Sequence, residues 1–275
     1  MTSQYERGKA FQALHQRESL LVLPNPWDAG SAKMLAGLGF EALATTSAGL
    51  AFSLGRCDAE GEVSREEALA NARAIVEATP LPVAADLENG YGDHPQDCLE
   101  TIRLAASIGL VGGSIEDASG RPDEPIYPFE LAVERVQAAV EAARSLGFPF
   151  TLAARAENHL HGRNDLDDTL RRLVAFAEAG ADVLYAPGLT TREQIAAVVS
   201  AVAPRPVNVL VGSPALRLTL EELAELGVRR VSLGSGLARV AFGAFFHAAQ
   251  ELAAGRLEAT QEGMPFAQIN QLFRR

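Results

Sequence analysis

Two acidic residues, Asp86 and Glu88, follow the short apolar run at residues 81–85. Such a run is typical of a buried parallel strand, which would put the acids at the carboxyl end of the strand. Alternation along a strand would then direct both side chains to one side, where two carboxylates repel each other unless a cation or a shared proton relieves them. Gly90 and Gly92 allow the backbone to turn sharply beside a ligand. The segment predicts a divalent-metal site, with an acidic turn of no function as the alternative.

A regular alternation of strand-like and helix-like segments surrounds these acids. The expected strands are residues 20–24, 41–45, 81–86, 110–115, 150–154, 182–185, 207–210 and 230–233. Asp28 is a plausible helix N-cap and Ser64 opens a capping box, while Gly39, Gly109, Gly180 and Gly227 read as left-handed caps at helix-to-strand turns. Eight such repeats in 275 residues favour a (β/α)8 barrel, a TIM-type α/β fold, over a doubly wound sheet.

The whole chain, residues 1–275, is expected to form one barrel domain. Helices at 237–254 and 265–274 exceed what a closed barrel needs, so we expect residues 237–275 to pack on a neighbouring subunit in a homodimer or homotetramer.

Composition narrows the class of protein. Hydrophobic residues make up 48% of the chain, yet no apolar run reaches the ~18 residues of a membrane span, and the polar start is unlike a secretory signal. Two cysteines, Cys57 and Cys98, fit a reduced cytoplasmic protein. The net charge of −11 argues against nucleic acid as a partner. These features predict a cytoplasmic protein that acts on small molecules, without a membrane or nucleic-acid partner.

Barrel enzymes carry their chemistry at the carboxyl ends of the strands. In this chain those ends and the loops after them carry Thr45, Thr46, Ser47, Asp86, Glu88, Glu116, Asp117, Arg155, Glu157, His159, Tyr185, Asn208, Ser232 and Ser235. Asp58, on the loop after the second strand, is close enough in sequence to reach the same face. Four acids with one arginine fit a hard cation held largely through water.

Four motifs together resemble the isocitrate lyase/phosphoenolpyruvate mutase superfamily. They are Thr45-Thr46-Ser47-Ala48-Gly49, Asp86-Leu87-Glu88-Asn89-Gly90-Tyr91-Gly92, Ser114-Ile115-Glu116-Asp117 and Ala154-Arg155-Ala156-Glu157. The resemblance covers residues 20–246 and implies a (β/α)8 barrel whose last helix is exchanged between subunits. It also implies Mg2+, with Mn2+ as a substitute, and substrates that are small 2-oxo or 2-hydroxy carboxylates.

The resemblance also implies roles for individual residues. Asp86 would be the main metal ligand, helped by Asp58, Glu88 and Glu116. The segment Thr46-Ser47-Ala48-Gly49 would bind the substrate carboxylate and keto oxygen, Asn208 the far carboxylate, and Arg155 the developing enolate. A metal and an arginine together suit an enolate released when a C–C or P–C bond breaks.

The loop after the fourth strand departs from the superfamily pattern. Residues 118–127 lack the lysine, cysteine and histidine of the isocitrate lyases and the lysine and asparagine of the mutases. The proton donor must then come from elsewhere: Tyr185, His159 or His161, or Tyr127. Arg121 is the only cation in this gate loop and either pairs with a substrate carboxylate or stays solvated. Trp27, after the first strand, either forms a wall of the substrate pocket or simply packs.

The sequence therefore predicts a Mg2+-dependent carbon–carbon lyase acting on an isocitrate- or methylisocitrate-like acid, with Arg155, Tyr185 and His159 as catalytic residues. The alternatives are an oxaloacetate decarboxylase or acetylhydrolase, a phosphonopyruvate-type P–C bond enzyme, and a non-catalytic binder of a 2-oxo acid.

Overall fold

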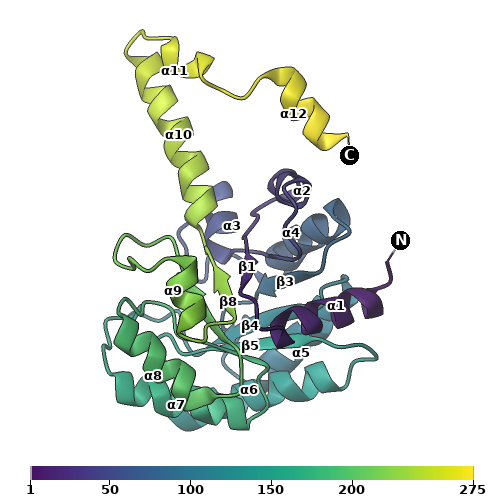
Figure 1. Cartoon of the computed structure of the whole chain (residues 1–275), viewed down its shortest axis with the longest axis vertical. Helices are drawn as coiled ribbons and strands as arrows, with labels where there is room; N and C mark the ends of the chain where they lie inside the picture. Colours follow the sequence, from purple (N-terminus) through teal and green to yellow (C-terminus); the bar gives the residue numbers. More distant parts are fainter. Residues whose placement is uncertain (1, 275) are drawn as a thin grey trace.

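A computed structural model describes residues 2–274 and contains an eight-stranded parallel sheet surrounded by helices (Figure 1). The strands are β1 (Leu21–Leu23), β2 (Leu43–Ala44), β3 (Val83–Asp86), β4 (Gly112–Glu116), β5 (Thr151–Arg155), β6 (Val183–Tyr185), β7 (Val207–Leu210) and β8 (Arg230–Ser232). They pair in the order β1-β8-β7-β6-β5-β4-β3-β2. The amide of Ala44 donates a hydrogen bond to the carbonyl of Pro24 over 3.1 Å, which brings the two sheet edges together. The predicted (β/α)8 barrel is confirmed.

Helices follow the strands in the expected alternation. They are α1 (Gln4–Gln16), α2 (Ala29–Gly37), α3 (Ser47–Ser53), α4 (Arg65–Ala78), α5 (Pro95–Ser107), α6 (Phe129–Arg144), α7 (Leu166–Glu178), α8 (Arg192–Val202), α9 (Leu220–Glu225), α10 (Gly236–Ala253), α11 (Glu258–Gln261) and α12 (Phe266–Phe273). Among residues 2–274, no helix combines the length and apolarity needed to cross a membrane.

Local turn chemistry agrees with the sequence-based expectation. Asp28 caps α2, and Ser64 forms a reciprocal capping box with Glu67 at the start of α4. The backbone at Gly109 has φ +98° and at Gly227 φ +89°, conformations that favour glycine over residues with a side chain. These positions end helices and direct the chain into β4 and β8.

Three helices were not predicted: α1, α3 and the short α11. The polar segment at the start of the chain, for which no helix was expected, forms α1. This helix buries Phe11 and His15 against the amino-terminal end of the barrel. The second helix, α3, follows directly after β2. Its N-cap is Thr46, whose hydroxyl accepts a hydrogen bond from the amide of Gly49. Thr46, which was expected at the end of a strand, therefore begins a helix.

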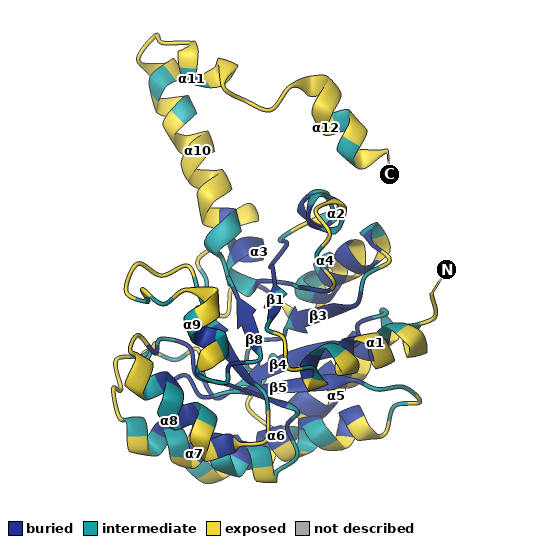
Figure 2. Ribbon diagram, viewed as in Figure 1, coloured by how far each residue is buried: buried dark blue, intermediate teal, exposed yellow. Residues whose placement is uncertain are grey.

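The core lies between the strands and the inward faces of the helices, while the outer helix faces are exposed (Figure 2). Helix α6 illustrates the pattern: Val136 and Ala139 are buried, and Glu134 and Glu141 on its other face are exposed. This packing fixes the strands, and with them the side chains at their ends.

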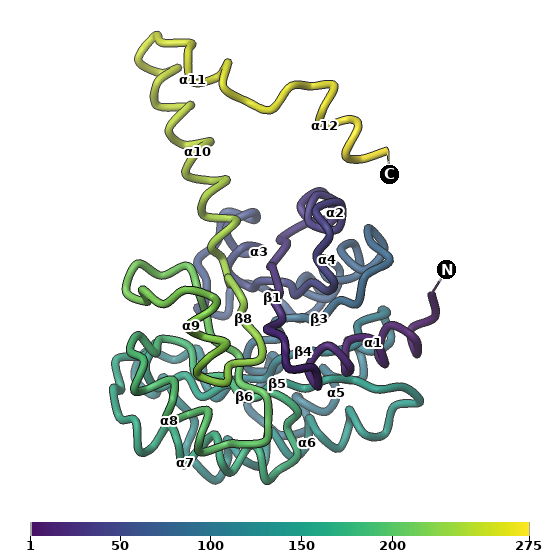
Figure 3. Tube along the Cα trace, viewed as in Figure 1, coloured from purple at the N-terminus to yellow at the C-terminus, as the bar shows by residue number. Residues whose placement is uncertain are grey.

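The last three helices leave the barrel. Helix α10 extends away from the end of β8, and the chain returns through α12 to lie against α2 (Figures 1 and 3). Several large apolar side chains on these helices are exposed, among them Val240, Phe245, Phe246 and Phe266.

Candidate active site

A cavity of about 220 Å³ opens at the carboxyl ends of the strands and extends into the barrel. Polar side chains from several strands and loops form its wall. The polar and charged lining residues are Asn25, Thr45, Thr46, Ser47, Asp58, Asp86, Ser114, Arg155, Tyr185, Arg230, Ser232 and Ser235. The predicted site residues that reach this cavity are Thr46, Ser47, Ala48, Asp58, Asp86, Arg155 and Tyr185.

Arg155, the last residue of β5, is the centre of the charged cluster. Its Nη1 lies 2.9 Å from Asp86 Oδ1 and 3.2 Å from Glu116 Oε2, and its Nε lies 2.8 Å from Glu157 Oε1. The guanidinium also stacks over the ring of Tyr185, 5.0 Å from its centroid. One largely buried cation is therefore shared among three carboxyl groups.

Asp86 occupies the position where β3 meets the cavity. Its Oδ2 accepts a hydrogen bond from the Ser47 hydroxyl over 3.0 Å, and its Oδ1 contacts Arg155. Burial and the nearby Asp86 raise the pKa of Asp58. Burial, Asp86 and Asp58 raise the pKa of Glu88 to about 8. These carboxylates destabilise one another's charged forms, as expected of groups that a cation would relieve.

The donor set fits a divalent cation of the magnesium type. Within residues 2–274, no three histidine, cysteine or acidic side chains form a ready-made metal cage. Mg2+ does not require one, because it commonly binds through one or two carboxylates and keeps several waters. Asp86 and Asp58 both line the cavity, so these two acids would hold the metal there.

Glu88 lies beyond the end of β3, so the strand alternation from which its position was predicted does not extend to it, although its charge is coupled to those of Asp86 and Asp58. Strand β3 ends at Asp86, and Glu88 sits in the following turn with φ +46°. The chain turns there because Leu87 is buried against Gly113. As a result Glu88 lines a separate depression next to Tyr91. Glu116 likewise is absent from the cavity wall and lies behind Arg155.

The candidate proton donors lie in different surroundings. Tyr185 lines the cavity, and burial raises its pKa to about 12, which keeps its hydroxyl protonated. His159 does not reach the cavity wall; its Nε2 is buried and has no hydrogen-bond partner among the described residues, and burial lowers its pKa. The hydroxyl of Tyr127 is bound to Asp93 and Asn89. Of these groups, Tyr185 is the one that faces the cavity.

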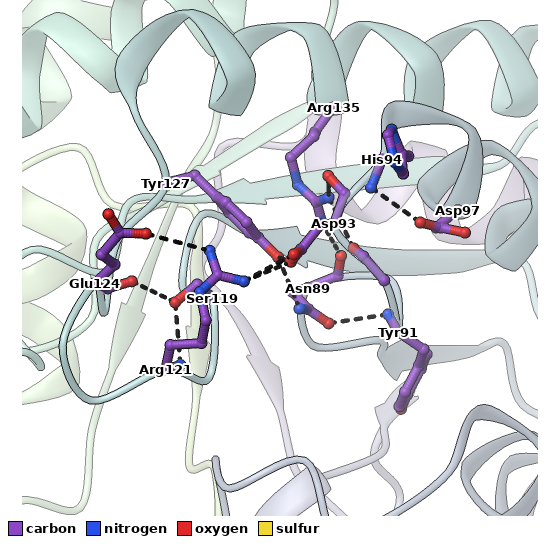
Figure 4. A network of polar contacts seen from close by, with 11 residues as sticks. Asn89, Tyr91, Asp93, His94, Asp97, Ser119, Arg121, Glu124, Tyr127 and Arg135 are labelled. Carbon is purple, nitrogen blue, oxygen red and sulfur yellow. Dashed lines mark hydrogen bonds and ion pairs between the residues drawn. The ribbon is translucent and has the colours of Figure 1, made fainter.

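The gate loop is tied to the loop after β3 (Figure 4). Arg121 lies 2.8 Å from Asp93 and 5.6 Å from the centroid of the Tyr127 ring, so it faces this network and not the cavity. Arg135 is buried, and its guanidinium donates hydrogen bonds to the carbonyls of Asn89, Gly92 and Asp93. The loop is held by its own ion pairs and hydrogen bonds.

Besides Arg121, three predicted binding residues lie outside the cavity wall: Gly49, Trp27 and Asn208. Gly49 is buried beside Trp27, where an added Cβ would lie 2.8 Å from the Cβ of that tryptophan. Trp27 itself forms an apolar pocket with Phe242 and Phe245 of α10. Asn208 is buried under the cavity and hydrogen-bonds to its neighbours on β8.

Two cavity residues were missed by the sequence analysis. Asn25 joins three strand ends: its Nδ2 donates to the carbonyl of Thr45, and its Oδ1 accepts from the amides of Leu233 and Gly234. Arg230, at the start of β8, lies in the barrel interior with its side chain at the cavity. The signal for Arg230 was present, because alternation along β8 puts it on the same inward side as Ser232.

Comparisons with known proteins find relatives over most of the chain. The sequence pattern of the phosphoenolpyruvate phosphomutase family matches residues 11–253. An uncharacterised protein of Mycobacterium tuberculosis H37Rv is 31% identical over 263 residues, 94% of each chain. The 2-methylisocitrate lyase of Salmonella typhimurium LT2 is 29% identical over 195 residues, which cover 68% of this chain and 64% of that enzyme.

Solved structures give the same picture over nearly the full length. A protein of Burkholderia cenocepacia J2315 described as a lyase or mutase superposes with a TM-score of 0.95 at 56% identity. The superposition covers 99% of this chain and 97% of that chain. An oxaloacetate acetylhydrolase bound to oxalate superposes with a TM-score of 0.87 at 27% identity, with 99% of this chain and 95% of that chain covered.

Proposed function

Because the chain belongs to the isocitrate lyase/phosphoenolpyruvate mutase superfamily, we propose that it is a Mg2+-dependent carbon–carbon lyase acting on a small 2-oxo or 2-hydroxy di- or tricarboxylate. The observation that carries the proposal is the grouping of Arg155, Asp86 and Ser47 on one wall of the cavity. A guanidinium fixed beside a metal-binding carboxylate suits a reaction that builds negative charge on a substrate oxygen.

Arg155 would stabilise an enolate formed when the carbon–carbon bond breaks. It is largely buried, so its charge acts in a region of low dielectric, and three carboxylates hold its orientation before the substrate arrives. Asp86 and Asp58 would hold Mg2+ or Mn2+ at the cavity wall, and Glu88 and Glu116, which lie outside that wall, would contribute through water. The metal, when bound, would polarise the 2-oxo or 2-hydroxy oxygen as a Lewis acid.

Tyr185 is the proposed proton donor. Its hydroxyl stays protonated at neutral pH and lies in the cavity wall beside Arg155. Proton delivery to the enolate carbon would complete the reaction without the cysteine that the gate loop lacks. His159 would act instead only if the loop that carries it moved, since it lies outside the cavity wall.

A second candidate function is cleavage of oxaloacetate, by decarboxylation or by hydrolysis to acetate and oxalate. Two observations favour it: the gate loop has no cysteine, histidine or lysine, and the fold matches an oxaloacetate acetylhydrolase over 99% of the chain. Product analysis separates the reactions. A tricarboxylate lyase would release succinate with a 2-oxo acid, decarboxylation would release pyruvate and CO2, and acetylhydrolysis would release oxalate and acetate.

The chain is further proposed to assemble through α10–α12 into a homodimer or homotetramer. The support is the exposed apolar surface of these helices, including Phe245, Phe246 and Phe266. Sedimentation equilibrium should give a mass of two or four chains, whereas a monomer at micromolar concentration would contradict this.

A further inference from the structure

Arg230 is a buried cation that faces the cavity without a carboxylate partner. Its exposed fraction is 7%, and no acidic side chain within residues 2–274 forms an ion pair with it. Two other buried arginines pair with acids: Arg155 contacts three carboxylates, and Arg172 pairs with Asp117 over 3.0 Å and with Asp168 over 2.7 Å. Arg135 donates instead to three backbone carbonyls. Burial lowers the pKa of Arg230 to about 10, so it still carries its charge at neutral pH. An unpaired buried charge is costly unless a ligand neutralises it.

Strand register connects Arg230 to the charged cluster at the cavity mouth. Arg155 on β5 pairs laterally with Tyr185 on β6, Tyr185 with Asn208 on β7, and Asn208 with Arg230 on β8. The side chains of lateral neighbours in a parallel sheet point to the same face. Because the strands of a barrel are staggered, a row of such neighbours runs down the barrel axis, away from the mouth of the cavity. The row begins at the last residue of β5 and ends at the first residue of β8. It therefore places one guanidinium at the mouth and a second deeper in the cavity.

The neighbours of Arg230 orient it without neutralising it. Its Nε donates to Asn208 Oδ1 over 2.9 Å, and Asn208 Nδ2 donates to the Ser232 hydroxyl over 2.9 Å. Its Nη1 lies 3.4 Å from His15 Nε2, while His15 Nδ1 lies 2.8 Å from the carbonyl of Phe11. A histidine that donates from Nδ1 to a carbonyl is free to accept at Nε2, so the imidazole beside Arg230 is neutral. The guanidinium has five N–H donors, and these two contacts leave the others available.

We propose that Arg230 binds a second anionic group of the substrate, at the inner end of the cavity, and so selects acids with two anionic groups over acids with one. The inference deepens the proposed function: Arg155 and the metal site would act at the reacting end, and Arg230 would hold the far end. Asn208 is then a positioning residue, because both ends of its amide are engaged by Arg230 and Ser232. The ligand chemistry is a carboxylate or a phosphonate, either of which matches the guanidinium fork.

Matched acids of equal length test the proposal by isothermal titration calorimetry with Mg2+. The pairs are oxaloacetate against 2-oxobutanoate and 2-oxoglutarate against 2-oxopentanoate, with phosphonopyruvate as the phosphonate. The unmodified protein should bind at least one dianion ten-fold or more tightly than its monoanionic partner. Preference for phosphonopyruvate over oxaloacetate would assign the inner group as phosphonate, and the reverse as carboxylate. Equal affinity within every pair, including no detectable binding of any acid, would overturn the proposal.

Variants identify Arg230 as the source of that preference. Arg230→Met should remove it, Arg230→Lys should retain part of it, and Asn208→Asp should remove it by giving the guanidinium a permanent counter-charge. The thermal midpoint of Arg230→Met should not fall, since the substitution removes an unpaired buried charge. A preference that survives in both Arg230→Met and Asn208→Asp would overturn the proposal.

The same variants separate this inference from the proposed function. If the protein cleaves a diacid and Arg230→Met leaves its KM unchanged, the lyase assignment stands and the role of Arg230 is wrong. If no acid is cleaved but diacid binding depends on Arg230, the inner subsite stands and the lyase assignment is wrong.

Discussion

Replacing Arg155 with methionine would leave Asp86, Glu116 and Glu157 facing one another without their shared cation. The three contacts of 2.9, 3.2 and 2.8 Å all end on one guanidinium whose side chain is 13% exposed, so little water can replace it. Removing one partner of a buried ion pair typically costs about 3–5 kcal/mol of unfolding free energy. We expect a loss of that size at pH 8.

The loss should shrink as the pH is lowered toward 5. Burial raises the pKa of Glu116 well above its usual range and that of Glu157 to about 7. A carboxyl whose folded pKa exceeds its unfolded value binds its proton more tightly in the folded state, so its contribution is most favourable at low pH and is lost as pH rises through the folded pKa. Without Arg155, which opposes this shift, both pKa values should rise further, and acid should restore stability to the variant.

Urea denaturation between pH 5 and pH 8 measures this directly. The matched control is Arg192→Met, which breaks the 3.0 Å pair between Arg192 and Glu222, where the two side chains are 42% and 37% exposed. That change should cost no more than about 1 kcal/mol at any pH. A loss in Arg155→Met that is equally small, or that does not vary with pH, would refute the shared-cation description of the cluster.

Three further substitutions test separate parts of the site. Asp86→Ala should abolish Mg2+-dependent turnover while circular dichroism shows an intact fold; full activity would remove Asp86 from the metal site. Tyr185→Phe should lower kcat by about 10²–10⁴-fold with little change in substrate affinity, as for the loss of a general acid, and an unchanged kcat would exclude Tyr185 as the proton donor. His15→Gln should flatten the pH dependence of stability: burial lowers the pKa of His15 to about 3, so the unfolded chain takes up the proton first as pH falls below 6.5. Between pH 6.5 and pH 5 the unmodified protein should lose about 2 kcal/mol through this group, and an equal loss in the variant would show that His15 is not responsible.

The fold was largely predictable because its signals are local. Glycines at Gly109 and Gly227 and the capping residues Asp28 and Ser64 act within a few residues of themselves, and all four occur where expected. The unexpected helices α1 and α3 have weaker signals. Helix α1 contacts the barrel through few residues, chiefly Phe11 and His15, and α3 begins at a threonine that also suits a strand end.

The site was predictable where strands end at the barrel mouth and unpredictable where the chain turns or the register matters. Asp58, Asp86, Arg155 and Tyr185 reach the cavity as the barrel rule predicts. Glu88 does not, because the turn around buried Leu87 breaks the alternation on which its position was inferred. Arg230 depends on the pairing of four strands, and that register is set by packing across the whole barrel.

The central claim is that a divalent cation and Arg155 together support cleavage of a small carboxylic acid in this cavity. The most direct test is ¹H NMR of the purified protein with isocitrate, 2-methylisocitrate, oxaloacetate and phosphonopyruvate, each with added Mg2+ and after metal removal. We predict that one acid is consumed with Mg2+, is stable after the metal is removed, and is consumed at least a hundred-fold more slowly by Arg155→Met. Consumption that continues without metal, or that Arg155→Met leaves unchanged, would contradict the mechanism. Failure to consume any of the four acids would contradict the assignment to these reactions.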